Sequence, residues 1–491
     1  MASINTSSVR EELDRLKSEF KRVSSEHRIS DEIALLMSSM LTLLELICAI
    51  FLEKSTTKNS RNSSKPSSQT DKDETALEQP GSKAKGKTER RQSAYNTRTI
   101  ETTTVATVNS CTICGEDLTG ITCHQHERRT KIDIIFEKTV EHVEAQVKNC
   151  PTCCAEVKGA FPADMPGPLQ YGNGLKAYVI NMLVCQMVAL NRVQKTISAM
   201  MDQVISEATL LKYVLRLHEA LDAWEKEAVR QLLQSPAMYV DETSLRVDRK
   251  NHWIHVYAAG DITLKRLHRK RGKEAIKAID IIPRYSGVIV HDCWASYLSY
   301  THCGHGLCGS HLLRELTFIV DSNGYTWAKN MKRALQETCK AVAASPDKRL
   351  GDAAYRNLQK RYRAILTRGE KELPAIPDKP QGKPGKMARS DAHNLWERLK
   401  EHEQAVLLFA KDGSVAFTNN RAERDLRMSK VKQKVSGCFR NSQYADAYCR
   451  ISSYLQTMAN KGHNPLIAIQ MALAGEIGGR VVTIIVWVLF Y

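Results

Sequence analysis

Three acidic residues in separate parts of the chain have the chemistry that a metal-dependent phosphoryl transfer requires. Asp241 follows the apolar segment Ala-Met-Tyr-Val, and Asp292 follows Val-Ile-Val-His. Glu423 lies near the start of a basic segment that reads Asn-Asn-Arg-Ala-Glu-Arg. Mg²⁺ prefers carboxylate oxygens and keeps positions open for a phosphate group. Carboxylates that converge from distant strand ends would therefore form a divalent-metal site.

Each of these carboxylates also has a structural explanation. A charged residue that follows an apolar strand commonly marks the exit of the chain to solvent, which applies to Asp241 and Asp292. If Asn420 is the N-cap of a helix, Glu423 occupies the glutamate position of a capping box. Strand order and flanking residues, taken for all three together, favour the catalytic interpretation.

The elements that must position these residues follow from the hydrophobic pattern. After residue 236 the apolar period changes to two, which predicts strands and short helices. Strands are expected at 237–243, 252–258, 263–268 and 287–292, helices at 273–281 and 294–300, and a fifth strand at 305–308. Helices at 311–366 and 392–408, with a Pro/Gly/Lys-rich loop between them, come before Glu423. The expected fold is multidomain, α plus α/β, with a mixed sheet interrupted by a helical insertion.

Cysteines at metal-ligand spacing predict a separate zinc unit at 109–160. Cys111-Thr-Ile-Cys114 and Cys150-Pro-Thr-Cys153 are two Cys-x-x-Cys knuckles, and each short turn directs two sulfurs toward one point. A redox site would need only one such pair, so structural Zn²⁺ is favoured. The nearby residues that could substitute as ligands are Cys123, His124, His126 and Cys154.

A second His/Cys group is less decisive. It consists of His302, Cys303, His305, Cys308 and His311, with Cys308-x-x-His311 just after the fifth expected strand. Zinc binding there stays open. Ordinary core and surface groups beside an active site are the favoured interpretation.

Composition indicates a polyanionic partner. The chain has 491 residues, enough for about two to four domains, and a net charge of +17. Nucleic acid is the partner that this charge favours, with an acidic membrane surface second. The fourteen cysteines and the absence of a secretory signal at the first residues predict a reducing cytoplasm.

The regions outside the expected core have distinct patterns. Residues 1–54 are expected to be helical, and Leu36, Leu43 and Ile50 repeat every seven residues with Met40, Leu46 and Ile47 between them. This seam favours a self-associating coiled coil over a membrane span. Residues 55–108 are expected to be a flexible basic linker, and 461–491 a tail whose apolar end is shorter than the roughly 20 residues that span a membrane. Residues 161–235 are expected to be helical, with helix-turn-helix character at 197–217.

Four longer segments resemble one known family. They are Tyr239-Val-Asp-Glu-Thr, Val290-His-Asp-Cys-Trp-Ala-Ser-Tyr, Cys308-Gly-Ser-His-Leu-Leu-Arg-Glu-Leu, and the segment from Thr418-Asn-Asn-Arg-Ala-Glu-Arg through Gly437. They are similar to the insertion-sequence-66 family of DDE transposases. The zinc knuckles and the stretch from Phe161 through Tyr171-Gly-Asn-Gly-Leu also resemble that family, so the similarity extends over about 109–460.

The resemblance implies a ribonuclease-H-like catalytic core at 236–460 with a helical insertion at about 311–416. It implies that Asp241, Asp292 and Glu423 form a catalytic triad that holds two Mg²⁺ (or Mn²⁺) ions. Glu242 would support the triad. Helical spacing places Arg427 and Lys430 on the face of Glu423, and with Arg424 they are candidates to bind DNA phosphates.

The function that the resemblance implies is transposition of an insertion sequence. The protein would bind the terminal inverted repeats, cleave the strands and join them to target DNA, as a homodimer or larger assembly in the prokaryotic nucleoid, with possible helper proteins of the same element and no membrane association. Two alternatives remain: a metal-dependent nuclease without strand transfer, and a catalytically inactive, zinc-containing DNA-binding repressor.

Overall fold

The structure is a computed structural model that describes residues 6–26, 29–55, 102–132, 137–375 and 389–476. Its described residues fall into two units. The first comprises Met1–Ala84 with Leu221–Lys461, and the second comprises Lys85–Ala220 with Gly462–Tyr491. The helical region expected at 161–235 therefore contributes to both units.

The first unit contains the predicted catalytic residues. Its strands are β3 (Ala237–Val247), β4 (Lys250–Ala259), β5 (Ile262–His268), β6 (Val288–His291) and β7 (Gly304–Leu307). Its helices are α1 (Thr6–Ser25), α2 (Asp31–Ser55), α6 (Asp222–Gln234), α7 (Lys273–Ile279), the 3₁₀ helix η4 (Ile282–Arg284), α8 (Ala295–Leu298), α9 (Gly309–Asn323), α10 (Thr326–Ala344), α11 (Asp352–Glu372), α12 (Asp391–Glu401), α13 (Glu403–Lys411), α14 (Asn420–Ser436) and α15 (Ser442–Asn460).

The five strands form one mixed sheet in the order β5-β4-β3-β6-β7. The β3–β4 and β4–β5 pairs are antiparallel, whereas β3–β6 and β6–β7 are parallel. The expected strands and the mixed α/β class are thus confirmed. β3 ends later than predicted, at Val247, because Asp248 and Arg249 form a tight hairpin turn with φ of 47° and 60°.

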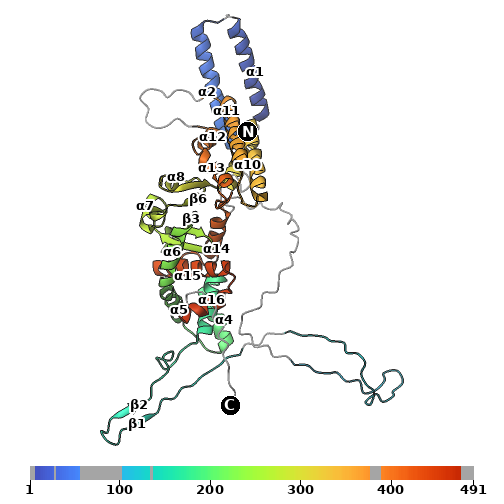
Figure 1. Cartoon of the computed structure of the whole chain (residues 1–491), viewed down its shortest axis with the longest axis vertical. Coiled ribbons are helices and arrows are strands. Elements are labelled where there is room, and N and C mark those ends of the chain that lie inside the picture. The colour runs from blue at the N-terminus through green and yellow to red at the C-terminus, as the bar shows by residue number, and fades with distance from the viewer. Residues whose placement is uncertain (1–5, 27–28, 56–101, 133–136, 376–388, 477–491) are drawn as a thin grey trace. The chain divides into compact units, whose positions relative to one another are not determined.

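Helices α14 and α15 pack against the sheet (Figure 1). Side chains of α15 satisfy the backbone of the edge strand β5. Ser453 Oγ accepts from Lys265 N at 2.8 Å, and Thr457 Oγ1 accepts from Thr263 N at 3.1 Å. These bonds cover an edge that would otherwise present unpaired donors.

The helical insertion, α9 to α13, confirms the helices expected at 311–366 and 392–408. Trp327, Tyr362 and Leu399 are fully buried in its core, which is continuous with residues of the sheet such as Val290 and Leu307. The second expected helix is divided at His402 into α12 and α13. The insertion separates β7 from α14 in sequence, yet the first residues of α9 lie beside those of α14.

Helices α1 and α2 confirm the expected helical character of the N-terminal segment. On α2 the apolar residues Leu36, Met40 and Leu43 are exposed, and self-association through them stays a prediction. The expected linker and the apolar C-terminal end lie largely outside the described residues. None of the described helices is long and apolar enough to cross a membrane.

The second unit consists of β1 (Val147–Asn149), β2 (Glu156–Lys158), α3 (Asn173–Ile180), the π-helix η3 (Asn181–Cys185), α4 (Leu190–Met201), α5 (Glu207–Ala220) and α16 (Pro465–Leu473). The helix pair expected at 197–217 is present as α4 and α5, and Ser206 Oγ accepts from Thr209 N at 3.2 Å, as an N-cap does. The segment expected to be a tail begins as α16, with Asn464 accepting from Leu466 N at 2.9 Å.

Candidate catalytic and metal-binding site

Parallel pairing places Asp241 and Asp292 at matching positions. Tyr239 of β3 is paired with Val290 of β6, and each aspartate lies two residues further along its strand direction. Asp241 Oδ1 accepts from Glu242 N at 2.8 Å, and Asp292 Oδ1 accepts from Trp294 N at 3.2 Å. The register therefore brings the first two predicted metal ligands to neighbouring positions.

Helix α14 presents Glu423 from its first turn, and the alternative explanation of this residue as part of a capping box does not hold. The N-cap is Asn419, not Asn420, and it makes no side-chain cap. Instead, Asn419 Nδ2 donates to Val240 O of β3 at 2.8 Å. This bond attaches the start of α14 beside Asp241, and it removes helix capping as the reason for a glutamate at position 423.

Glu423 lines an open groove of about 700 Å³. We call it the Glu423 groove; its lining residues are Tyr239, Arg314, Ala416, Thr418, Asn420, Arg421, Glu423, Arg424 and Arg427. Side chains alternate along a strand, so Asp241 lies on the same face of β3 as Tyr239. The groove thus combines one carboxylate with several guanidinium groups next to the strand that carries Asp241.

The carboxylates act on one another electrostatically. Burial raises the pKa of Asp241 well above its usual value, and the charges of Glu242, Asp292 and Glu423 raise it further. Like charges disfavour ionisation unless a cation compensates them. A divalent cation would relieve this repulsion, so the three predicted ligands fit Mg²⁺ in charge and donor type.

Glu242 occupies a different environment from Asp241, since adjacent strand residues point to opposite faces. Its side chain is 1% exposed and pairs with Arg271, whose Nη2 and Nε lie 2.6 and 2.8 Å from Oε1. Tyr297 donates to Oε2 at 2.5 Å. Burial raises the pKa of Glu242 and the nearby charge of Asp292 raises it further, while Tyr297 and Arg271 act in the opposite direction.

Aromatic rings hold Arg271 in place. Its guanidinium lies 4.4 Å from the ring centroid of Trp294 and 5.1 Å from that of Trp253. Such cation–π contacts restrict the side chain. Sequence reasoning assigned Glu242 a supporting role but missed Arg271, because no periodicity or spacing distinguishes it from the adjacent Arg269 and Lys270.

The basic residues predicted on α14 divide into two environments. Arg424 and Arg427 line the Glu423 groove. Lys430 instead donates to Ser244 O and Oγ at 3.3 and 3.2 Å. Burial lowers its pKa, although Asp241 acts to raise it. Lys430 is thus engaged with β3, whereas the two arginines face the groove.

A tighter cluster forms where α9 and α14 begin. Ligand atoms of Cys308, His311 and Glu423 all lie within 4.8 Å of one another. His311 Nδ1 is 3.5 Å from Glu423 Oε1. Burial alone lowers the pKa of His311, but Cys308 and Glu423 outweigh it and raise the value to about 9. Burial likewise acts to raise the pKa of Cys308, and contact with His311 leaves it below its usual value.

The other members of the second His/Cys group are satisfied by hydrogen bonds. His302 Nε2 lies 3.1 Å from Ile282 O, and Cys303 donates to Tyr285 O at 3.1 Å. His305 Nδ1 lies 3.1 Å from Nε2 of His291. The group predicted from sequence therefore separates into three structural residues and the Cys308–His311 pair.

A close backbone approach creates this cluster. Gly309 N donates to Phe417 O at 2.7 Å, and Asn419 N donates to Cys308 Sγ at 3.1 Å. A Cβ on Gly309 would overlap the ring of Phe417. Glycine at position 309 lets α9 approach the segment before α14 without displacing this ring.

We expect Gly309→Ala to lower the free energy of unfolding by about 1–3 kcal/mol, the usual cost of overpacking. Equilibrium denaturant unfolding of the full chain measures it. Gly351→Ala is the matched control, since a Cβ there meets nothing within 4 Å, and its cost should stay below about 1 kcal/mol. Equal effects for the two variants would show that the approach is not tight.

The two Cys-x-x-Cys knuckles adopt the same turn. Gly115 N donates to Cys111 O at 3.0 Å, and Cys154 N donates to Cys150 O at 2.9 Å. Gly115 and Cys154 both have positive φ. Backbone N–H groups of Cys153 and Thr152 lower the pKa of Cys150 to about 7, and those of Cys114 and Ile113 lower the pKa of Cys111. These turns favour thiolates, which zinc requires. Among the described residues, the close group of metal-ligating side chains is Cys308, His311 and Glu423 rather than the knuckles. A Zn²⁺ shared by Cys111, Cys114, Cys150 and Cys153 therefore stays a prediction.

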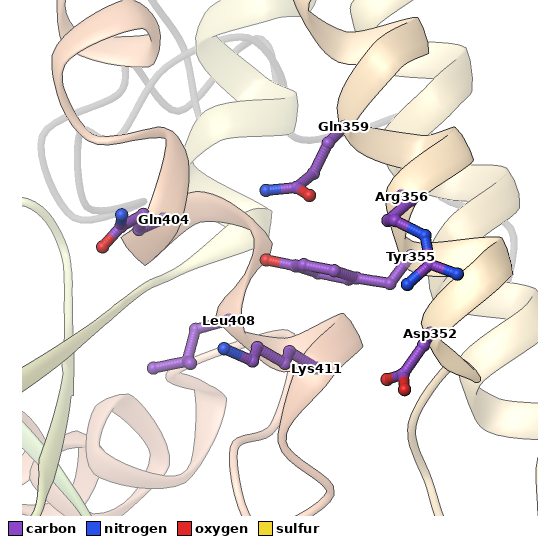
Figure 2. A pocket seen from close by; sticks show the side chains of 7 residues that line it. All are labelled: Asp352, Tyr355, Arg356, Gln359, Gln404, Leu408 and Lys411. Carbon is purple, nitrogen blue, oxygen red and sulfur yellow. The ribbon is translucent and has the colours of Figure 1, made fainter.

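A further pocket of about 330 Å³ lies in the helical insertion between α11 and α13. Figure 2 shows Tyr355 and Arg356 extending from α11, with Leu408 and Lys411 on α13 opposite. It contains none of the predicted site residues, and its mixed Asp352, Arg356 and Lys411 lining favours no particular ligand.

Comparison with known proteins identifies the family of the chain. The family model described as Transposase IS66 family matches residues 168–447, more than half of the chain. The protein belongs to the IS66 transposase family, and it is therefore a DNA-processing enzyme by class. The matched region includes the strand-end aspartates, the Cys308–His311 pair and Glu423, but not the zinc knuckles. No curated protein matches the chain.

Proposed function

We propose that this protein is the transposase of an insertion sequence, which binds the element ends and catalyses metal-dependent DNA cleavage and strand transfer. The observation that carries this proposal is the placement of three carboxylates from separate elements of a transposase-family chain: the parallel register of β3 and β6 sets Asp241 and Asp292 at matching positions, and the Asn419–Val240 hydrogen bond attaches the helix of Glu423 next to Asp241. The strand order β5-β4-β3-β6-β7, with its antiparallel and parallel halves, supports a ribonuclease-H-like core.

Asp241, Asp292 and Glu423 would hold two Mg²⁺ (or Mn²⁺) ions. When bound, such ions neutralise phosphate charge and favour the ionised form of an attacking hydroxyl. Residues around the three carboxylates position and orient these ligands. Arg271 and Tyr297 fix the carboxylate of Glu242, whose charge acts on Asp241, and the Asn419–Val240 hydrogen bond fixes the first turn of α14.

DNA phosphates would be bound by the arginines of the Glu423 groove. Arg424 and Arg427 line it on the side of α14, and Arg314 Nη2 lies 4.0 Å from Glu423 Oε2. Fixed cations next to the reacting phosphate stabilise charge without reorganisation. The net charge of +17 would add salt-dependent affinity.

The remaining expected partners rest on the sequence and on the family. The α4–α5 pair and the zinc knuckles are the candidate readers of the terminal inverted repeats. The exposed apolar residues of α2 would support a homodimer or a larger assembly. We place the protein in the prokaryotic cytoplasm with the nucleoid, and helper proteins of the element are possible partners.

We expect the double variant Arg424→Ala/Arg427→Ala to bind DNA more weakly and with less salt dependence. The slope of log K against log salt should fall by about 0.9 for each phosphate that the protein no longer neutralises. Fluorescence anisotropy at several salt concentrations measures it. Lys340→Ala on the exposed face of α10 is the control for removal of charge alone. An unchanged slope in the double variant would remove both arginines from the DNA interface.

The proposed reaction is tested by incubating the protein with element-end DNA, target DNA and Mg²⁺. Products in which an end is covalently joined to target DNA support the transposase. Ends that are cleaved but never joined favour the nuclease alternative. Specific binding without any cleavage favours the inactive repressor.

A further inference from the structure

The trio of Cys308, His311 and Glu423 combines three different donor atoms at one point. The Cys308 residue is 1% exposed, and the side chains of His311 and Glu423 are 12% and 31% exposed. His311 Nδ1 and Glu423 Oε1 are both buried atoms without a hydrogen-bond partner, although they lie 3.5 Å apart. Two buried, unsatisfied polar atoms that face each other indicate a missing partner.

The donor set identifies the kind of partner. Thiolate sulfur, imidazole nitrogen and carboxylate oxygen are the three ligand types of Zn²⁺, whereas Mg²⁺ avoids sulfur and nitrogen. A thiolate and a carboxylate carry two negative charges, which match a dication. Three protein ligands leave a fourth position open, unlike the four-cysteine set expected at the knuckles.

The backbone already holds the donors in place. Cys308 and His311 are three residues apart at the start of α9, so they share one face of the helix. The Gly309–Phe417 and Asn419–Cys308 hydrogen bonds bring the first turn of α14 to them. Assembly of the site would therefore require small side-chain movements only.

We propose that Cys308, His311 and Glu423 form a second metal site that takes Zn²⁺, and that its occupation withdraws Glu423 from Asp241 and Asp292 and inhibits the enzyme. The proposed metal site is supported by the positions of its three donor atoms and does not depend on the proposed function. The inhibition rests on the proposed function, in which Glu423 completes the Mg²⁺ site. One carboxylate is thus shared between two metal sites of different chemistry.

An ion pair is the competing explanation for the trio. A Cys308 thiolate and a His311 imidazolium would interact with Glu423 without any metal, and Arg314 at 4.0 Å from the other carboxylate oxygen would complete this network. The two explanations differ in metal content, which is directly measurable.

The first experiment counts Zn²⁺ in the full-length chain after metal removal, Zn²⁺ reloading and dialysis. We expect Cys308→Ser and His311→Ala each to hold one Zn²⁺ fewer than the wild type. Cys303→Ser, a buried thiol outside the trio, is the control and should match the wild type. Co²⁺ in place of Zn²⁺ gives a second readout, since the thiolate absorption band should be weaker in Cys308→Ser but unchanged in Cys303→Ser.

Circular dichroism establishes that each variant is folded, and having two ligand variants protects the test if one of them is unstable. Equal Zn²⁺ counts in wild type, Cys308→Ser and His311→Ala would overturn the metal site and favour the ion pair. This result does not depend on any catalytic activity.

The second experiment titrates Zn²⁺ into the Mg²⁺-dependent cleavage assay. We expect the wild type to be inhibited, and the half-inhibitory Zn²⁺ concentration to rise about tenfold or more in His311→Ala relative to that variant's own uninhibited rate. An extra bound Zn²⁺ without inhibition would overturn the shared-ligand claim. Failure of the wild type to cleave under any condition would instead overturn the proposed function and leave the zinc count intact.

Discussion

Asp241→Asn is expected to abolish DNA cleavage, with a decrease in rate of about 10³-fold or more. A ligand to the catalytic metals contributes several kcal/mol of charge stabilisation, and each 1.36 kcal/mol corresponds to a tenfold change in rate. Single-turnover cleavage of end DNA measures this decrease. Binding of the same DNA should persist, because the groove arginines Arg424 and Arg427 are unchanged.

The same substitution should not destabilise the protein in the absence of metal. The pKa of Asp241 is raised in the folded state, so its ionised form opposes folding at neutral pH, and an uncharged amide removes that penalty. The free energy of unfolding should stay equal or rise. Asp248→Asn, in the hairpin turn that ends β3, is the matched control and should cleave like the wild type. Cleavage by Asp241→Asn at the wild-type rate would contradict its role as a ligand.

Arg271→Ala is expected to lower the free energy of unfolding by about 3 kcal/mol, because it leaves the buried Glu242 carboxylate with Tyr297 as its remaining partner. The guanidinium is 42% exposed, which places the effect at the lower end for a broken buried pair. Denaturant unfolding measures it. Cleavage should also slow, because Glu242 adjoins Asp241.

The neighbouring Arg269→Ala is the control for Arg271, since it removes an exposed charge from the same loop. Its effect on unfolding should be within about 0.5 kcal/mol of zero. In addition, Glu242→Gln should recover part of the stability that Arg271→Ala removes, because an amide needs no buried counterion. If Arg271→Ala proved as stable as Arg269→Ala, the pair would contribute nothing to the fold.

Local sequence patterns predicted the helices and strands well, but they did not predict which of these elements pair or pack together. The strands around Asp241 and Asp292 were recognisable from apolar runs of period two, and β6 from its continuous Val-Ile-Val. Their register was not, because pairing of β3 with β6 depends on contacts between residues far apart in sequence. Spacing also identified Arg424 and Arg427, which share a helix with Glu423.

The parts of the site that sequence reasoning missed are all long-range. Cys308-x-x-His311 was visible as a spacing, but its approach to Glu423 requires the whole α9–α13 insertion to fold back. Arg271 meets Glu242 only through the tertiary structure. The N-cap of α14 also depends on long-range contacts, since Asn419 binds the backbone of β3 rather than its own helix, a choice that no local capping rule anticipates.

The most direct test of the catalytic claim is the single-turnover cleavage rate of Glu423→Gln on element-end DNA with Mg²⁺. Glutamine preserves the size of the side chain and removes its charge. Our account predicts that cleavage is abolished while DNA binding and thermal unfolding remain close to those of the wild type. Cleavage at the wild-type rate would contradict it, and would limit Glu423 to its contacts with His311 and Arg314.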